Sequence, residues 1–136
     1  MEKISTSITK LSGCMVIIGM ALVLITRLVR PVLETNQPVI TIFFGILPNF
    51  GAAMALPFLF FQIAPLLFPI VHKWLPGLSF TIALVLSFAV LSLWEAAQFL
   101  LWAYPSDPYD ILASGLGVLV AFAVHQLFDR VTAQHH

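Results

Sequence analysis

The sequence predicts an all-α membrane protein, a bundle of four transmembrane helices. The chain of 136 residues is 60% hydrophobic and only 9% charged, and its mean hydropathy is +1.03. Its apolar residues are gathered into long segments separated by short polar stretches, and a segment of about 20 apolar residues can cross a bilayer. One small soluble core cannot bury so much apolar surface. We therefore expect a single transmembrane helical domain over residues 1–136, with the lipid bilayer as its partner.

The charged and sulfur-containing residues exclude several function classes. Six Lys and Arg balance six Asp and Glu, and the basic residues are scattered, so we expect no nucleic-acid partner and no polybasic lipid patch. Cys14 is the single cysteine, which we interpret as a small buried apolar residue. No metalloprotease motif, nucleophile elbow or phosphate loop is present. We expect no metal and no cofactor, and the sequence favours a protein that is not an enzyme.

The first two spans differ in how clearly the sequence defines them. A basic start and an apolar run resemble a signal peptide, but no cleavage site follows, so we expect a retained helix over about residues 11–29. The next apolar stretch, 39–71, is too long for one span and too short for two. Pro48 and Asn49 can start a helix. We therefore predict a second span over about 49–71, preceded by an interfacial or re-entrant segment at 39–47.

The last two spans follow a turn, HKWLPG, whose Trp and Lys suit the membrane interface. The third is predicted over about 78–104 and the fourth over about 107–128, with the proline-flanked YPSDP between them. Four spans place both termini and the HKWLPG turn on one side. That side carries more basic residues than the other: Lys3, Lys10, Lys73 and Arg130 against Arg27 and Arg30. The positive-inside rule then predicts a multi-pass protein of the plasma membrane with both termini in the cytoplasm.

Glu95 is the most informative residue for function. It lies about nine residues before Tyr104, roughly 13 Å inward from that helix end. A carboxylate at such depth costs about 2.5 to 3.5 kcal/mol, so we expect Glu95 to face the bundle and to be paired, hydrated or protonated. Gln98 extends the polar stripe by one turn. The two residues form either part of a binding pocket or interhelical hydrogen-bond glue, and both interpretations stay open.

The acidic start of the fourth span has a structural explanation beside a functional one. Asp107 fits an N-cap, with Pro108 in the first turn and Asp110 at N3, where a carboxylate suits the helix dipole. Asp110 also projects from the same face as Ser114. Ser114 lies at about the depth of the third-span polar pair, and Asn49 either caps its own helix or joins this group.

Six residues therefore make up the predicted outward-facing polar pocket: Glu95, Gln98, Asp107, Asp110, Ser114 and Asn49. The same fourth span carries small residues at four-residue spacing, Ala113, Gly117 and Ala121, which let a neighbouring helix approach closely. We predict that they pack the third helix on the fourth. His125 belongs to the other half of the bundle, where it packs near its helix end or takes part in a proton relay.

The spacing E-x-x-Q followed by D-x-x-x-S-x-x-G, formed by Glu95, Gln98, Asp110, Ser114 and Gly117, resembles the VanZ-like family of small bacterial integral membrane proteins. That family shows a Glu/Gln pair near the end of one span, a loop with an Arg, and D-x-x-x-N-x-x-G opening the next span. Here Ser replaces the Asn, and Tyr104 or a neighbour stands where the family carries its Arg. Arg27 or Arg30 from the first loop could substitute for that Arg.

The resemblance covers about the last third of the chain and implies a divergent VanZ-like protein. It implies a cell-envelope role, because the founding member is associated with low-level resistance to the glycopeptide teicoplanin. The predicted pocket would bind a polar group of an envelope component, a cation, or a helix of another membrane protein. Two alternatives stay open. One is a membrane-embedded enzyme acting on a lipid-linked substrate, with Glu95 as general base and Asp107 and Asp110 holding Mg²⁺ through water; the other is a small transporter subunit that depends on Glu95.

Overall fold

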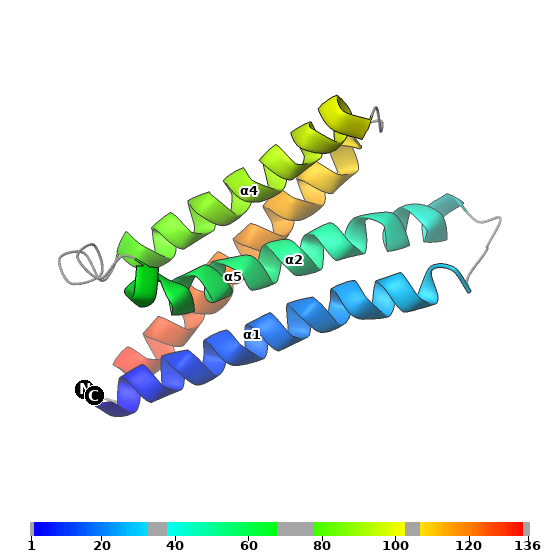
Figure 1. Ribbon diagram of the computed structural model, residues 1–136. Coiled ribbons are helices and arrows are strands. Elements are labelled where there is room, and N and C mark those ends of the chain that lie inside the picture. The colour runs from blue at the N-terminus through cyan, green and yellow to red at the C-terminus, as the bar shows by residue number, and fades with distance from the viewer. Residues whose placement is uncertain (1, 33–37, 68–77, 103–106, 135–136) are drawn as a thin grey trace.

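The computed structural model describes residues 2–32, 38–67, 78–102 and 107–134. These residues form four long helices (Figure 1). They are α1 (Glu2–Val29), α2 (Pro38–Leu67), α4 (Leu78–Trp102) and α5 (Pro108–Ala133). Each contains a stretch long and apolar enough to cross a membrane. No strand occurs in the described ranges. The predicted all-α fold with four candidate transmembrane helices is confirmed.

α2 is the central helix of the bundle. It packs against α1, α4 and α5, and α4 packs in addition against α5. Figure 1 shows α1 and α4 along opposite edges of α2, with α5 behind. The first turns of α1 and the last turns of α5 lie at the same end of the bundle, and the last turns of α1 and α4 and the first turns of α2 and α5 lie at the other end. The alternating direction of the helices agrees with four antiparallel spans.

The predicted division of the second apolar stretch is wrong. α2 runs without interruption from Pro38 to Leu67, so residues 39–47 are its first turns and no helix begins at Pro48 or Asn49. Pro48 removes one backbone N–H from the helix. The helix nevertheless continues through this position, because lipid offers a broken backbone no alternative partner. At 1.5 Å per residue the 30-residue helix is about 45 Å long, so a stretch longer than the hydrocarbon core is accommodated by one long helix.

The other predicted boundaries need smaller corrections. α1 begins at Glu2 rather than near residue 11, although its membrane-compatible part is Ile8–Val29. α5 continues to Ala133, beyond the predicted end at 128. The predicted ends of the second span at 71 and of the third at 104, and the turn HKWLPG, lie outside the described residues.

Glycines allow the helix backbones to approach closely. A Cβ on Gly19 of α1 would lie 2.5 Å from the carbonyl oxygen of Gly51 and 2.6 Å from Ala55 Cβ, both on α2. A Cβ on Gly117 of α5 would lie 2.5 Å from the carbonyl oxygen of Phe50 on α2. Side chains larger than hydrogen would push these helices apart, so the glycines set the spacing of α1 and α5 from α2.

The small-residue stripe of α5 is a packing face, but its closest contact is not with the predicted helix. Ala113, Gly117 and Ala121 are all buried, and Gly117 meets α2 at Phe50 and Ala53. α4 also packs on α5, but the atoms nearest to Gly117 belong to α2. The reason is that α2 presents the small Ala53 side chain and the backbone of Phe50 and Met54 opposite Gly117.

The apolar core lies between the cavity described below and the end that holds the first turns of α1. Its buried members come from all four helices and are Met15, Met54, Phe58, Phe80, Leu84 and Ala121. Cys14 is exposed, so its interpretation as a buried residue is wrong. It shares an outward face of α1 with Ile17 and Ile18, which are also exposed. A small apolar thiol suits a lipid-facing surface as well as it suits a core.

Candidate functional site: a polar cavity at one end of the bundle

A cavity of about 570 Å³ lies where the second half of α1 meets the ends of the other helices. Each helix, counted with the residue that directly flanks it (Arg30 after α1 and Asp107 before α5), supplies three lining residues. α1 and α2 supply Thr26, Arg27, Arg30, Gly45, Pro48 and Asn49. α4 and α5 supply Trp94, Glu95, Gln98, Asp107, Pro108 and Asp110. Its volume lies within the range of about 300–1,000 Å³ that is typical of small-molecule sites.

Glu95 forms the most deeply buried charged part of the lining, with 7% of its surface exposed. Its Oε1 accepts a hydrogen bond from Nδ2 of Asn49 on α2 over 3.3 Å. The same oxygen accepts a second bond from Nε2 of Gln98 over 3.5 Å, one turn away on α4. A buried carboxylate needs such donors, because it has lost its water. Asn49 does not cap a helix; it joins α2 to the polar group of α4.

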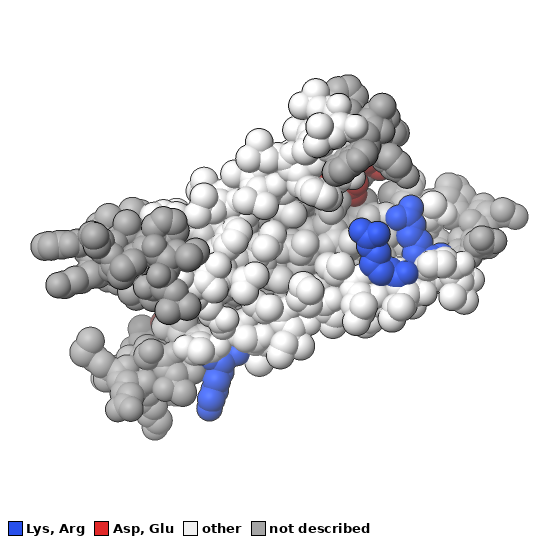
Figure 2. Space-filling view, in the orientation of Figure 1, with Lys and Arg blue, Asp and Glu red and all other residues white. Residues whose placement is uncertain are grey.

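Asp110 brings the start of α5 into the same electrostatic group. The Asn49 amide also interacts with the Asp110 carboxylate, and so does the positive charge of Arg30 on α1. The negative charges of Glu95 and Asp110 repel each other. Figure 2 shows basic side chains near the end of α1 across from acidic atoms beneath the end of α4. The cavity thus has a positive wall, formed by Arg27 and Arg30, and a negative wall, formed by Glu95, Asp107 and Asp110. The Asn49 amide joins two members of the negative wall, Glu95 and Asp110.

Asp107 has the helix-start role that its position predicts. Its Oδ1 accepts a hydrogen bond from the backbone N–H of Tyr109 over 2.9 Å, and Pro108 stands in the first turn. Asp110 is also in the first turn, where the helix dipole favours a carboxylate. Asp107 is exposed at the rim of the cavity, so the residue that caps α5 also lines the cavity.

The α2 wall is shaped by two residues that present little side chain. A Cβ built on Gly45 meets nothing within 4 Å, so the space in front of this glycine is open. Pro48 has no N–H, and the carbonyl of Phe44, four residues earlier, therefore lacks its usual helical donor. Because neither residue carries a long side chain, the positive and negative walls face each other across bare backbone.

Five of the six residues predicted for a pocket line this cavity: Asn49, Glu95, Gln98, Asp107 and Asp110. Ser114 does not. It is buried one turn further into the bundle, 2% exposed, and its Oγ has no hydrogen-bond partner among the described residues. Its side chain lies on the packing face of α5 together with Gly117. A depth similar to that of Glu95 therefore does not bring Ser114 to the cavity.

Sequence reasoning did not place Thr26, Gly45 and Trp94 at this site, and it offered Arg27 and Arg30 only as substitutes for a missing loop Arg. Both arginines line the cavity. The signal that locates them is the antiparallel order of the spans, which brings the end of α1 to the same end of the bundle as the end of α4 and the start of α5. Gly45 carried no such signal, because residues 39–47 were expected to be a separate segment.

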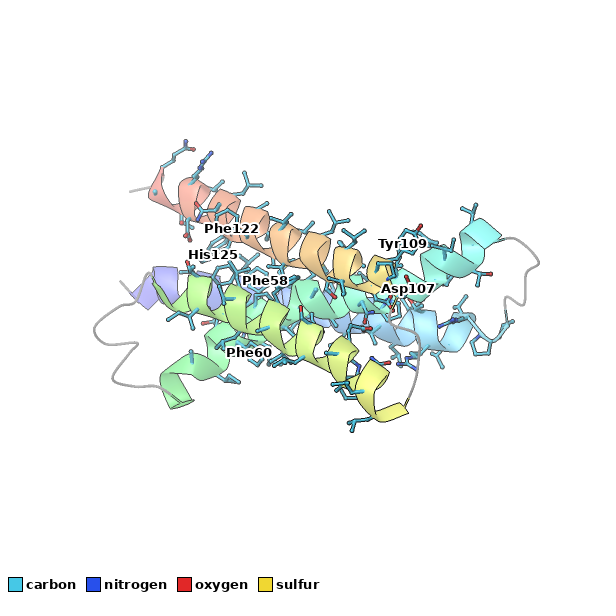
Figure 3. The ribbon with its side chains drawn as sticks, turned by 90° about the horizontal axis from the view of Figure 1, so that it is seen from above. Phe58, Phe60, Asp107, Tyr109, Phe122 and His125 are labelled. Carbon is cyan, nitrogen blue, oxygen red and sulfur yellow. The ribbon has the colours of Figure 1, made fainter. Side chains whose placement is uncertain are left out.

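A second, smaller cavity of about 230 Å³ surrounds His125 at the other end of the bundle. The His125 ring lies 3.7 Å from the Phe80 ring, centroid to centroid, and its Nε2 is 3.4 Å from Oδ2 of Asp129. Figure 3 shows His125 and Phe122 far along α5 from Asp107 and Tyr109. His125 therefore packs near its helix end, away from the carboxylates of the larger cavity.

Within the described residues, no three His, Cys, Asp or Glu side chains gather closely enough to hold a metal ion. Comparison of the chain with protein-family models, with curated proteins and with solved structures gives no match.

Proposed function

We propose that this chain is a VanZ-like integral membrane protein of the bacterial cell envelope, and that its polar cavity binds a polar group of an envelope component. One observation carries the proposal: the two arginines of α1 and the carboxylates of α4 and α5 line a single open cavity. Side chains that served only as glue between helices would meet directly. Here space for a small molecule lies between them.

The arrangement of charges supports the resemblance to the VanZ-like pattern. That pattern combines a Glu/Gln pair, an Arg and an Asp, and this sequence has no Arg between Gln98 and Asp110. Arg30 reaches the same group from α1, and its charge acts on Asp110. A cation from a different helix thus supplies the charge that the loop of the family would supply, and the chemical character of the site is retained.

The proposed orientation places the cavity toward the outside of the plasma membrane. The cavity lies at the end of the bundle opposite the first turns of α1 and the last turns of α5. Lys10 and Arg130 belong to the end that holds both chain termini. The positive-inside rule then assigns that end to the cytoplasm and the cavity to the outer side, where envelope components and glycopeptide antibiotics are found.

The envelope role is tested by expressing the chain in a teicoplanin-susceptible Gram-positive bacterium and measuring the inhibitory concentration of the antibiotic. Wild type is expected to raise it, and Glu95→Gln is expected to abolish the increase, because the amide keeps the shape but loses the charge. Asp129→Asn is the matched control, since it makes the same change of charge at the other cavity. Membrane levels of the three chains are compared by immunoblot. Equal protection by wild type and Glu95→Gln would refute the proposed role of the cavity.

A further inference from the structure

We infer that the ligand is a membrane amphiphile whose headgroup carries a phosphate next to a primary ammonium group, with the phosphate on the α1 arginines and the ammonium on the carboxylates of α4 and α5. The inference rests on the proposed function and names the ligand class of the same cavity. Four features lead to it: the separation of the charges, the hydrogen-bonding capacity of Glu95, the depth of the cavity, and the side on which it opens.

The charges of the lining are separated by helix. Arg27 and Arg30 belong to α1, whereas Glu95, Asp107 and Asp110 belong to α4 and α5. A purely anionic ligand would meet repulsion from three carboxylates, and a purely cationic one would meet two guanidinium groups. A zwitterion with its charges on neighbouring groups satisfies both walls. The planar guanidinium fork binds phosphate in two-pronged geometry, so the anionic end of the ligand lies on α1.

Glu95 has capacity for a ligand donor. Among the described residues, its two hydrogen bonds, from Asn49 and Gln98, both reach Oε1. Oε2 is left to accept from another donor, and a carboxylate that is 7% exposed gains much from a charged one. A primary ammonium carries three N–H donors, whereas a quaternary ammonium carries none. The negative wall therefore favours the primary amine.

The cavity lies at the depth of lipid headgroups. α1 ends at Val29 and α5 begins at Pro108, so Arg30 directly follows the first helix and Asp110 lies two residues into the last, both within about 5 Å of a helix end. Glu95 lies deeper, seven residues or about 10 Å before α4 ends at Trp102. Polar headgroups begin where the hydrocarbon core ends. Phosphate is thus the anion that a bilayer presents at the level of the arginines.

The cavity opens toward the bilayer. α1 and α4 lie along opposite edges of α2 (Figure 1). The cavity is lined by residues near the ends of both helices and by Gly45 and Pro48 of α2. Arg27 on one rim is exposed, and Trp94 on the other is 54% exposed. Trp side chains favour the membrane interface. A headgroup can therefore enter between α1 and α4 while its acyl chains stay in the membrane.

The test uses the full chain purified in detergent and native mass spectrometry of lipid adducts. Dioleoyl phosphatidylethanolamine, phosphatidylglycerol and phosphatidylcholine are added at equal concentration in separate samples, and free phosphoethanolamine in a fourth. Wild type is expected to retain the ethanolamine lipid about tenfold more than the other two, the equivalent of one charge-assisted contact. Free phosphoethanolamine is expected to bind much more weakly than the lipid.

Variants that change single charges test which wall of the cavity binds the phosphate and which binds the ammonium group. Arg30→Gln is expected to lower retention of the ethanolamine and glycerol lipids alike, and Arg30→Lys to restore part of it. Glu95→Gln is expected to remove the preference for ethanolamine over glycerol and choline lipids. Asp129→Asn is expected to behave as wild type. Melting temperatures of all chains are measured in the same detergent, so that loss of fold is separated from loss of binding.

The contrary results are distinct. Equal retention of ethanolamine, glycerol and choline lipids by wild type would overturn the assignment of a primary ammonium. Binding of free phosphoethanolamine as tight as that of the lipid would overturn the membrane source of the ligand. No retention of any lipid would overturn the inference as a whole. The antibiotic measurement above judges the proposed function separately, because it depends on no particular ligand.

Discussion

Nδ2 of Asn49 on the central helix α2 donates a hydrogen bond over 3.3 Å to Oε1 of Glu95 on α4, 46 positions further along the chain. The bond lies at the base of the polar cavity, because both residues belong to its lining. It therefore has two consequences. It holds α4 to the central helix, and it fixes the position of a carboxylate that lines the cavity. Oε1 of Glu95 makes the contact between helices, and the proposed binding uses Oε2 of the same side chain.

The first prediction concerns the stability of this pair. Asn49→Leu removes a donor from a carboxylate that is 7% exposed, and it is expected to lower the free energy of unfolding by about 1 to 3 kcal/mol. Glu95→Leu added to Asn49→Leu removes the unsatisfied acceptor and is expected to recover most of the loss. Unfolding is followed by circular dichroism in detergent. Strictly additive effects of the two substitutions would show that the side chains are not coupled.

The second prediction compares two glycines of α5 that lie two positions apart. A Cβ on Gly117 would lie 2.5 Å from the backbone oxygen of Phe50, whereas one on Gly115 would meet only the end of the Phe88 ring at 3.9 Å. Gly117→Ala is expected to destabilise the chain by about 1 to 3 kcal/mol through overpacking. Gly115→Ala is expected to be neutral or stabilising by up to about 1 kcal/mol, because alanine favours a helix. Equal melting temperatures of the two variants would contradict the close α2–α5 contact.

The third prediction separates the two roles of Asp107. Its Oδ1 caps α5, and its charge belongs to the negative wall. Asp107→Ser keeps a capping oxygen and should retain stability within a few tenths of a kcal/mol, whereas Asp107→Ala should cost about 0.5 to 2 kcal/mol. Both remove the charge, so both should weaken retention of the ethanolamine lipid. If Asp107→Ser binds the lipid as wild type does, the residue acts on the helix alone.

Part of this architecture can be predicted from the sequence. Four apolar segments divided by polar turns are enough to give the number and order of the helices, and DPYD is enough to give the cap at Asp107. Hydrophobicity does not report helix continuity, however. It gave no means to decide between a helix through Pro48 and a break there, because both place the same apolar residues in the same membrane.

The cavity itself could be predicted only in part. Residues close in sequence, such as Glu95 and Gln98, reveal their common face through the helical period. The arginines of α1 and the open space at Gly45 depend on which helices are neighbours, and that depends on matching of small residues such as Gly19 with Gly51 and Gly117 with Ala53. Ser114 was assigned to the pocket because it lies at about the same depth in the bundle as Glu95, and this assignment is wrong. Two side chains at equal depth can point to different sides of the bundle.

The fourth prediction concerns orientation. If the cavity faces outward, both ends of the chain lie in the cytoplasm. A green fluorescent protein fused after His136 should therefore be fluorescent, and alkaline phosphatase at the same position should be inactive. Phosphatase inserted in the segment 33–37 should be active. The opposite pattern of activities would place the cavity on the cytoplasmic side and remove its access to external envelope components.

The most direct test of the central claim fills the cavity without changing its charges. A Cβ on Gly45 or on Gly13 meets nothing within 4 Å, so Gly45→Leu and Gly13→Leu should both fold, but only the first projects into the cavity. The measurement is the fraction of chains that retain one dioleoyl phosphatidylethanolamine molecule by native mass spectrometry. We expect Gly13→Leu to match wild type and Gly45→Leu to lose at least about tenfold in retention, equivalent to 1.4 kcal/mol. Retention by Gly45→Leu equal to that of Gly13→Leu would contradict a ligand site between the arginines and the carboxylates.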